Sequence, residues 1–175
     1  MSVQESAQES AVPEATGFRC SGLHELLAGK PSAALAAALP AFARYSEWRA
    51  HRLFTVEEQQ QLLRAGIERL CAQPGATGAV LWRGTQVQGL CVVTPLPWDS
   101  AHFGLAMCRL DAWLLPDVPD TAVAHWLQQA LAAARTLQPA HLSTHVDSED
   151  YALFNALAQA GFRLLDAKRT FVARR

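Results

Sequence analysis

The chain has 175 residues, of which 50% are hydrophobic and 18% are charged, and its formal net charge is −1. These values suit one globular domain and exclude a collagen, a disordered chain and a disulfide scaffold. Fifteen basic and sixteen acidic side chains give no positive field for nucleic acid, and no apolar run approaches the ~18 residues that suggest a membrane span.

The N-terminus is polar and lacks the apolar stretch of a secretory signal. We therefore predict a flexible tail over residues 1–16, a single domain over 17–175 and a cytoplasmic location. The four cysteines lie far apart without a C-x-x-C pair, so neither a metal site nor a redox motif is predicted. Cys71 and Cys91 lie in apolar segments and are predicted to be reduced core residues.

Residues 18–27 are mixed in character and suit either a short strand or a helical turn. The alanine-rich residues 31–50 favour a helix, which Pro40 must kink or divide. Thr55 and Glu58 form the T-x-x-E pattern of a capping box, which predicts that a helix begins there.

That helix is predicted to end near Ala72, before a Gln-Pro-Gly sequence. The hydrophobic period then changes from that of a helix to that of a strand. Residues 78–82 and 86–94 are short apolar runs separated by a turn containing glycine, which predicts a hairpin. Residues 103–114 are predicted to form a third strand.

The rest of the chain alternates between helix and strand. The predicted elements are a helix over 121–137, a strand over 141–146, a last helix ending before Gly161 and a strand over 162–173. Asp120 is predicted to cap the first of these helices, and Asp147 or Ser148 the second. The element order predicts an α/β or α+β sheet with helices on its faces.

This order resembles the GCN5-related N-acetyltransferase (GNAT) fold, a mixed, mostly antiparallel sheet flanked by helices. Two local patterns carry the resemblance. Gly161-Phe162 is similar to the pair with which the last GNAT helix commonly ends. Residues 98–104 read W-D-S-x-x-F-G, similar to a segment in one half of dTDP-fucosamine acetyltransferase-like proteins. The resemblance implies transfer of an acyl group from a thioester, acetyl-CoA or an acyl carrier protein, to a small-molecule amine.

Two departures from the GNAT pattern favour an alternative. GNAT enzymes hold the CoA pyrophosphate in a Q/R-x-x-G-x-G/A loop, whereas residues 114–121 contain no glycine, two prolines, Asp117 and Asp120. The tyrosine that protonates the leaving thiolate in many GNAT enzymes corresponds to Leu157. The alternative is therefore a catalytically inactive GNAT-like module that binds a ligand, or pairs with a second copy or another GNAT-like chain. The cofactor contacts predicted in the loop are Leu114, Leu115 and Thr121.

His145 and Asp147 alternate onto one face at the C-terminal end of a predicted strand, the edge at which open α/β sheets bind ligands. This arrangement suits a general base with an orienting carboxylate that also binds substrate. The alternative is that Asp147 only caps the next helix and His145 is half exposed. His141 lies about 13 Å from His145 along the strand, so the two cannot share a metal.

The W-D-S segment supplies a second set of candidates. Asp99 or His102 could accept the proton of an acceptor amine. Trp98, Ser100 and Phe103 would then frame a small substrate pocket. The alternative is a tight turn in which Asp99 or Ser100 hydrogen-bonds nearby backbone.

Overall fold

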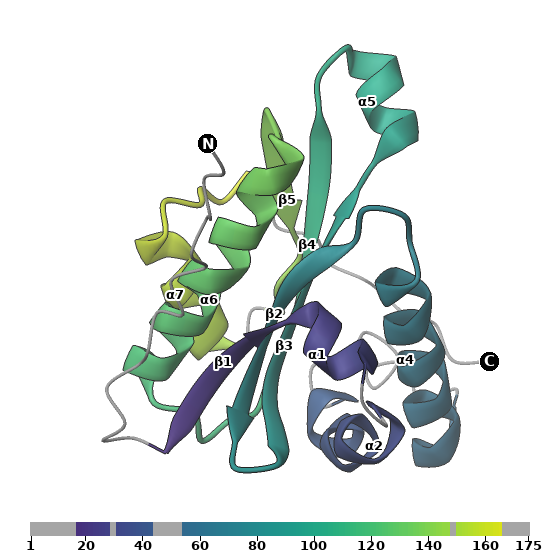
Figure 1. The fold of residues 1–175 in the computed structure, drawn as a ribbon, viewed down its shortest axis with the longest axis vertical. Coiled ribbons are helices and arrows are strands. Elements are labelled where there is room, and N and C mark those ends of the chain that lie inside the picture. Colours follow the sequence, from purple (N-terminus) through teal and green to yellow (C-terminus); the bar gives the residue numbers. More distant parts are fainter. Residues whose placement is uncertain (1–16, 29–30, 44–53, 148–149, 166–175) are drawn as a thin grey trace, which may run out of the picture.

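A computed structural model describes residues 17–28, 31–43, 54–147 and 150–165. In these residues a five-stranded sheet lies between two groups of helices (Figure 1). The strands are β1 (Phe18–Gly22), β2 (Thr77–Arg83), β3 (Gln86–Pro95), β4 (Met107–Leu114) and β5 (His141–Thr144). The helices are α1 (Leu23–Ala28), α2 (Pro31–Phe42), α4 (Val56–Cys71), α5 (Pro97–Phe103), α6 (Asp120–Ala134) and α7 (Tyr151–Gln159), with a 3-10 turn, η3 (Arg135–Leu137), after α6.

The strands lie in the order β1-β2-β3-β4-β5. The first three pairings are antiparallel, and β4 and β5 are parallel. The parallel pair needs a crossover, which α6 and η3 supply. The predicted fold class, a mixed and mostly antiparallel sheet flanked by helices, is confirmed.

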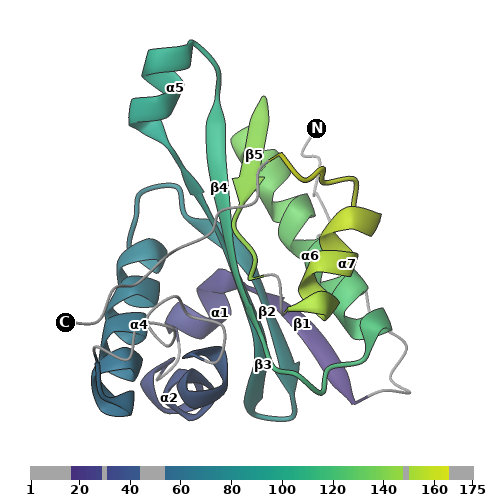
Figure 2. The ribbon, with the colours of Figure 1, turned by 180° about the vertical axis from the view of Figure 1, so that it is seen from behind.

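Each face of the sheet carries its own hydrophobic core. On one face, α6 and α7 cover residues that include Leu81, Val93 and Leu110. On the other face, α1, α2 and α4 cover residues that include Val80 and Val92 (Figure 2). Successive side chains of a strand point to opposite faces, so the continuous apolar runs of β2 and β3 fit a sheet that is buried on both sides.

The predicted hairpin is confirmed as β2 and β3, and one glycine permits their close approach. A Cβ at Gly78, whose φ is +153°, would lie 2.0 Å from the carbonyl oxygen of Cys91. The backbones could not pair here with a larger residue. The register shifts between Leu81 and Trp82, which marks a bulge.

Two predicted helix ends are also confirmed. The Thr55 hydroxyl accepts the Glu58 N–H at 3.2 Å, and the Glu58 carboxylate accepts the Thr55 N–H at 2.7 Å. At the end of α7, Gly161 has a φ of +93°. The Phe162 N–H donates to the Leu157 carbonyl at 3.0 Å. This is the six-to-one hydrogen bond of a Schellman motif with glycine at C′.

The predicted caps of the last two helices are wrong. Asp150, not Asp147 or Ser148, caps α7, because its carboxylate accepts the Leu153 N–H at 3.1 Å. β5 ends at Thr144, and the Asp150 N–H donates to the Asp147 carbonyl at 3.0 Å, so a turn separates the strand from the helix. Pro119 is the N-cap of α6, and Asp120 is its first residue.

The W-D-S segment forms the short helix α5. The tight turn and the strand start at residue 103 that were predicted for this segment are therefore both wrong. Pro97 suits the start of a helix, and Gly104, with a φ of +66°, ends it. The third strand consequently begins at Met107 rather than at residue 103. Figure 1 shows α5 projecting beyond the helices on both faces of the sheet.

The remaining differences lie near the ends of the chain. Residues 18–27 contain both a strand and a helix, and Pro40 lies inside α2, two residues before that helix ends. Residues 162–165 have no regular secondary structure. The rest of the predicted final strand, the predicted tail over 1–16 and part of the predicted helix over 31–50 lie outside the described residues. The predicted extent of the domain, 17–175, stays a prediction.

Candidate functional site

The candidate site lies where β4 and β5 separate. The two strands pair over four residues, from Met107 opposite His141 to Leu110 opposite Thr144. Beyond that point β4 continues through Asp111 to Leu114 and pairs only with β3. Among the described residues, the β5-facing backbone groups of this part of β4 therefore have no partner strand.

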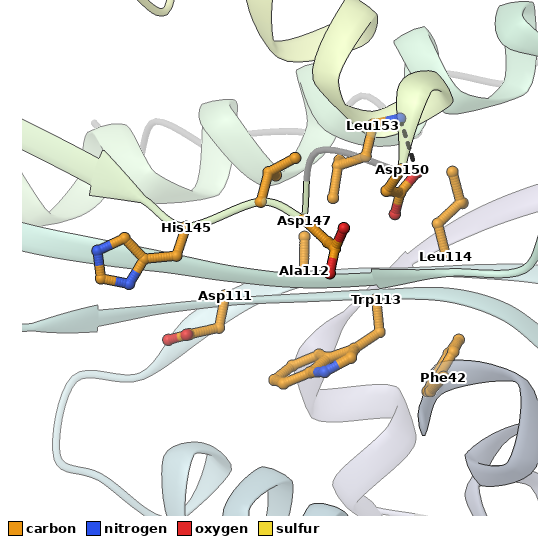
Figure 3. Close-up of a pocket in the computed structure, with 10 residues that line it drawn as sticks. Phe42, Asp111, Ala112, Trp113, Leu114, His145, Asp147, Asp150 and Leu153 are labelled. Carbon is orange, nitrogen blue, oxygen red and sulfur yellow. Dashed lines mark hydrogen bonds between the residues drawn. The ribbon is translucent and has the colours of Figure 1, made fainter. Parts of the chain in front are cut away.

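A cavity of about 130 Å³ occupies this separation (Figure 3). Its walls come from α2, β4, the residues that follow β5, and the start of α7. The lining residues are Phe42, Asp111, Ala112, Trp113, Leu114, His145, Val146, Asp147, Asp150 and Leu153. The chain brings these residues together because α2 covers one side of β4 and α7 follows β5 directly.

The cavity wall combines two aromatic side chains with three carboxyl groups. Asp111 forms an ion pair with Arg109, with 2.8 Å between Oδ2 and Nε. Asp150 is only 8% exposed. Burial raises the pKa of Asp150; the hydrogen bond from the Leu153 N–H opposes this shift, and the nearby Asp147 carboxylate adds to it. The wall next to α7 therefore disfavours further negative charge.

His145 and Asp147 both line the cavity, although the strand predicted over 141–146 ends at Thr144 and both residues follow it. Both side chains are exposed. In Figure 3 the imidazole of His145 extends away from the carboxylate of Asp147. The role of His145 as a general base oriented by Asp147 stays a prediction.

The second set of candidates, on α5, does not line this cavity. α5 precedes the start of β4 at Met107, which lies four residues, about 13 Å, from Asp111 along the strand. Trp98 and Phe103 are 73% and 60% exposed. The ring of His102 stacks on Trp98 at 5.3 Å and meets Phe103 edge-on at 4.9 Å. The structure therefore separates Asp99 and His102 from His145 and Asp147.

Ser100 has a clear local role. Its hydroxyl donates to the Leu96 carbonyl at 2.7 Å and accepts the Met107 N–H at 2.9 Å. These bonds tie α5 to the first residue of β4. This agrees with the alternative in which Ser100 bonds nearby backbone, although the segment is a helix and not a turn.

The loop between β4 and α6 does not fit a CoA pyrophosphate. Pro116 and Pro119 have no N–H group, and the Leu115 N–H already donates to the Gln88 carbonyl at 2.8 Å. The N–H groups of Ala122 and Val123 both donate to the Pro119 carbonyl. A pyrophosphate needs such N–H groups to be free.

The predicted contacts in this loop have unequal surroundings. Leu114, the last residue of β4, is buried and lines the cavity. Leu115 is partly buried and packs against the core, and Thr121 is exposed in the first turn of α6. Leu157, at the position of the GNAT tyrosine, is 4% exposed and belongs to the core between α7 and the sheet. It supplies no proton.

Sequence reasoning missed Phe42, Asp111, Trp113 and Asp150. The signal for Asp111 was that it and Arg109 are charged residues inside an otherwise apolar strand. Phe42 lies more than sixty residues earlier in the chain, and only the tertiary fold brings it to β4.

The four cysteine thiols offer no ready nucleophile, because burial raises the pKa of each. The predicted burial of Cys71 and Cys91 is confirmed, and all four thiols are free. Burial raises the pKa of the Cys20 and Cys71 thiols to about 11, so neither is a ready nucleophile. Within the described part of the chain, no three His, Cys, Asp or Glu side chains are placed to hold a metal ion. No helix there has the length and apolarity needed to cross a membrane.

No protein-family model and no curated protein sequence matches this chain. Solved structures do match it. A GCN5-related N-acetyltransferase from Ralstonia eutropha matches with a TM-score of 0.52 and 13% identity, over 89% of this chain and 98% of that one. An aminoglycoside N-acetyltransferase in complex with CoA matches with a TM-score of 0.53 and 13% identity, over 94% and 99%.

The chain has the GNAT fold. At such low identities the likeness extends to the fold and no further. A transcriptional regulator from Bacillus halodurans also matches, with a TM-score of 0.56 and 12% identity, over 89% of this chain and 98% of that one. The similarity of residues 98–104 to dTDP-fucosamine enzymes stays a prediction.

Proposed function

We propose that the chain transfers an acyl group from a thioester to a small-molecule amine in the cavity between β4 and β5. The observation that carries this proposal is the separation of the two strands. It creates a cavity next to an unpaired strand edge, with a histidine in its wall. An extended acyl donor can hydrogen-bond to such an edge as an added strand would.

The composition of the cavity supports an amine as the acceptor. Asp147 and Asp150 contribute carboxyl groups, in addition to Asp111, which is paired with Arg109, and Phe42 and Trp113 contribute aromatic surface. Carboxylates and aromatic faces both attract an organic cation. A small ammonium compound therefore suits the cavity better than an anionic or a purely apolar molecule.

The reaction requires the ammonium group to lose a proton before it attacks. His145 is the histidine of the cavity wall, and an imidazole can act as a general base. The amine nitrogen then bonds to the thioester carbonyl carbon and the carbon–sulfur bond breaks. The thiolate leaves, the nitrogen of the new amide loses its second proton to water, and the proton held by His145 passes to solvent.

No dedicated acid is needed for the leaving group. A thiol has a pKa of about 8.5, so the thiolate is a good leaving group and takes its proton from water. The burial of Leu157 at the position of the GNAT tyrosine is compatible with this route.

The test is a mass-spectrometric assay for N-acetyl products, with the full chain, acetyl thioesters and a panel of small amines. We expect His145→Gln to lower kcat by a factor of about 10² to 10⁴, the range for loss of a general base. His141→Gln is the matched control, since His141 begins β5, four residues before His145, and does not line the cavity. Equal rates for the wild type and His145→Gln would contradict the assigned base.

The second candidate is a GNAT-like binding module without catalysis, which acts by itself or in a pair with a second chain. The loop from Leu115 to Pro119, with few free N–H groups, favours it. It predicts that small amines bind to the cavity but that no product forms with any thioester. Calorimetry with the amine panel, combined with sizing chromatography, separates it from the enzyme.

A further inference from the structure

The loop between β4 and α6 limits which part of an acyl donor this chain can recognise. We propose that the donor is bound only through its thioester and the extended pantetheine arm behind it. The nucleotide diphosphate of CoA then makes no favourable contribution to binding. This inference rests on the proposed function and concerns the specificity of that same site.

The first observation is the shortage of hydrogen-bond donors. Of the residues between β4 and α6, two are prolines, and the Leu115 N–H is already bonded to β3. Val118 is only 6% exposed, so its side chain anchors the loop in the core. The loop is therefore fixed in a shape that offers few N–H groups to a phosphate.

The second observation is the charge at the start of α6. The N-terminus of a helix attracts anions through its partial positive charge. Here Asp117 and Asp120 are both exposed beside it, and Asp120 is the first residue of the helix. Their carboxylates offset the helix dipole and repel a pyrophosphate.

The third observation is an unpaired edge of β4, to which the pantetheine arm can bind. From Asp111 to Leu114, β4 offers about 10 Å of strand edge that no strand pairs on the β5 side in the described residues. The two amide groups of a pantetheine arm can hydrogen-bond to such an edge. The arm thus has a place along β4, whereas the diphosphate has none at α6.

The test is calorimetry of the purified chain with three compounds, without an acceptor amine. They are acetyl-CoA, S-acetylpantetheine and adenosine 3′-phosphate 5′-diphosphate, the nucleotide half of CoA. We expect acetyl-CoA to bind no more tightly than S-acetylpantetheine, and the nucleotide half neither to bind nor to compete.

The possible results are distinct. Acetyl-CoA binding about tenfold or more tightly than S-acetylpantetheine would overturn this inference and leave the proposed function standing. Binding of the nucleotide half alone would also overturn it. If neither thioester binds, the proposed function itself fails, and this inference fails with it.

Two variants test the loop directly. Asp117→Asn and Asp120→Asn should each tighten acetyl-CoA by about two- to fivefold at low salt, the range for one charge near a helix N-terminus. Neither should change the affinity for S-acetylpantetheine. The matched control is Glu57→Gln, which removes an exposed carboxylate from the first turn of α4. Weaker acetyl-CoA binding in the aspartate variants would contradict the repulsion.

Discussion

Asp150 combines two opposing effects at the start of α7. Its carboxylate caps the helix by accepting the Leu153 N–H, which favours the charged form. The same side chain is 8% exposed and lies near Asp147, and both features raise its pKa. A folded-state pKa above the unfolded value means that ionisation of Asp150 costs folding free energy.

The raised pKa of Asp150 determines how its contribution to stability changes with pH. Between the ordinary Asp pKa of about 4 and the higher folded value, the folded chain binds more protons than the unfolded chain. The contribution of Asp150 to stability is therefore full at pH values below about 4 and falls as the pH rises through the folded pKa.

We predict that Asp150→Asn increases Tm relative to wild type as the pH is raised from about 4 to 7, since asparagine caps a helix as well as aspartate. Asp150→Ala should instead cost about 1 kcal/mol, because the cap is lost. Thermal unfolding followed by circular dichroism across this range measures both. Asp117→Asn, in an exposed loop, is the control. A Tm difference for Asp150→Asn that does not vary with pH would contradict the assigned cause.

At the scale of the element, α4 shows local chemistry and tertiary packing acting together. The capping box starts the helix, and Leu63, Ile67 and Cys71 are buried against the sheet. Most helical stability in proteins comes from such packing, while the cap fixes where the helix begins.

We predict that Thr55→Ala lowers the free energy of unfolding by about 1 kcal/mol, because the Glu58 N–H loses its acceptor. Thr85→Ala, at an exposed turn residue, should change it by less than about 0.5 kcal/mol. Urea denaturation of both variants measures the difference. Equal effects would show that the capping box adds nothing to the stability of α4.

α5 is the element for which local signals were misread. The sequence Pro-Trp-Asp-Ser suits a turn, yet Pro97 is also compatible with the first turn of a helix. Ser100 bonds to the carbonyl of Leu96 four residues earlier, and its bond from the Met107 N–H holds the helix against β4. No periodicity could reveal these bonds, because the segment is only two turns long.

At the scale of the whole molecule, Trp126 joins α6 to the sheet. It is fully buried, and its Nε1–H donates to the Ala79 carbonyl at 3.0 Å. Its ring also lies where a Cβ at Gly89 would meet it at 3.4 Å. The core on this face is built around this one side chain.

We predict that Trp126→Phe lowers the free energy of unfolding by about 1–3 kcal/mol, because a buried carbonyl loses a donor and the smaller ring leaves space. Trp98→Phe makes the same chemical change at an exposed residue and should cost less than about 0.5 kcal/mol. Chemical denaturation provides both values. A large loss in Trp98→Phe would mean that α5 contributes to the core, contrary to its exposure.

Much of the fold could be predicted because its signals are local. The hairpin, the capping box of α4, the long stripe of α6 and the glycine after α7 each depend on residues within one or two turns of one another. The cap of α7 was mispredicted because three acidic residues and a serine compete within four positions. Which of these residues caps α7 depends on where β5 ends.

The length and the near-neutral composition by themselves determined that the chain forms a small globular fold, and the order of periodic segments determined a sheet with helices on both faces. Those properties follow from hydrophobic patterning, which each segment carries independently. The tertiary structure alone decided that β4 parts from β5 after Leu110. It also brought Phe42 to the same cavity as His145 and left α5 apart from both. Such contacts join residues distant in sequence, and their geometry depends on how whole elements pack.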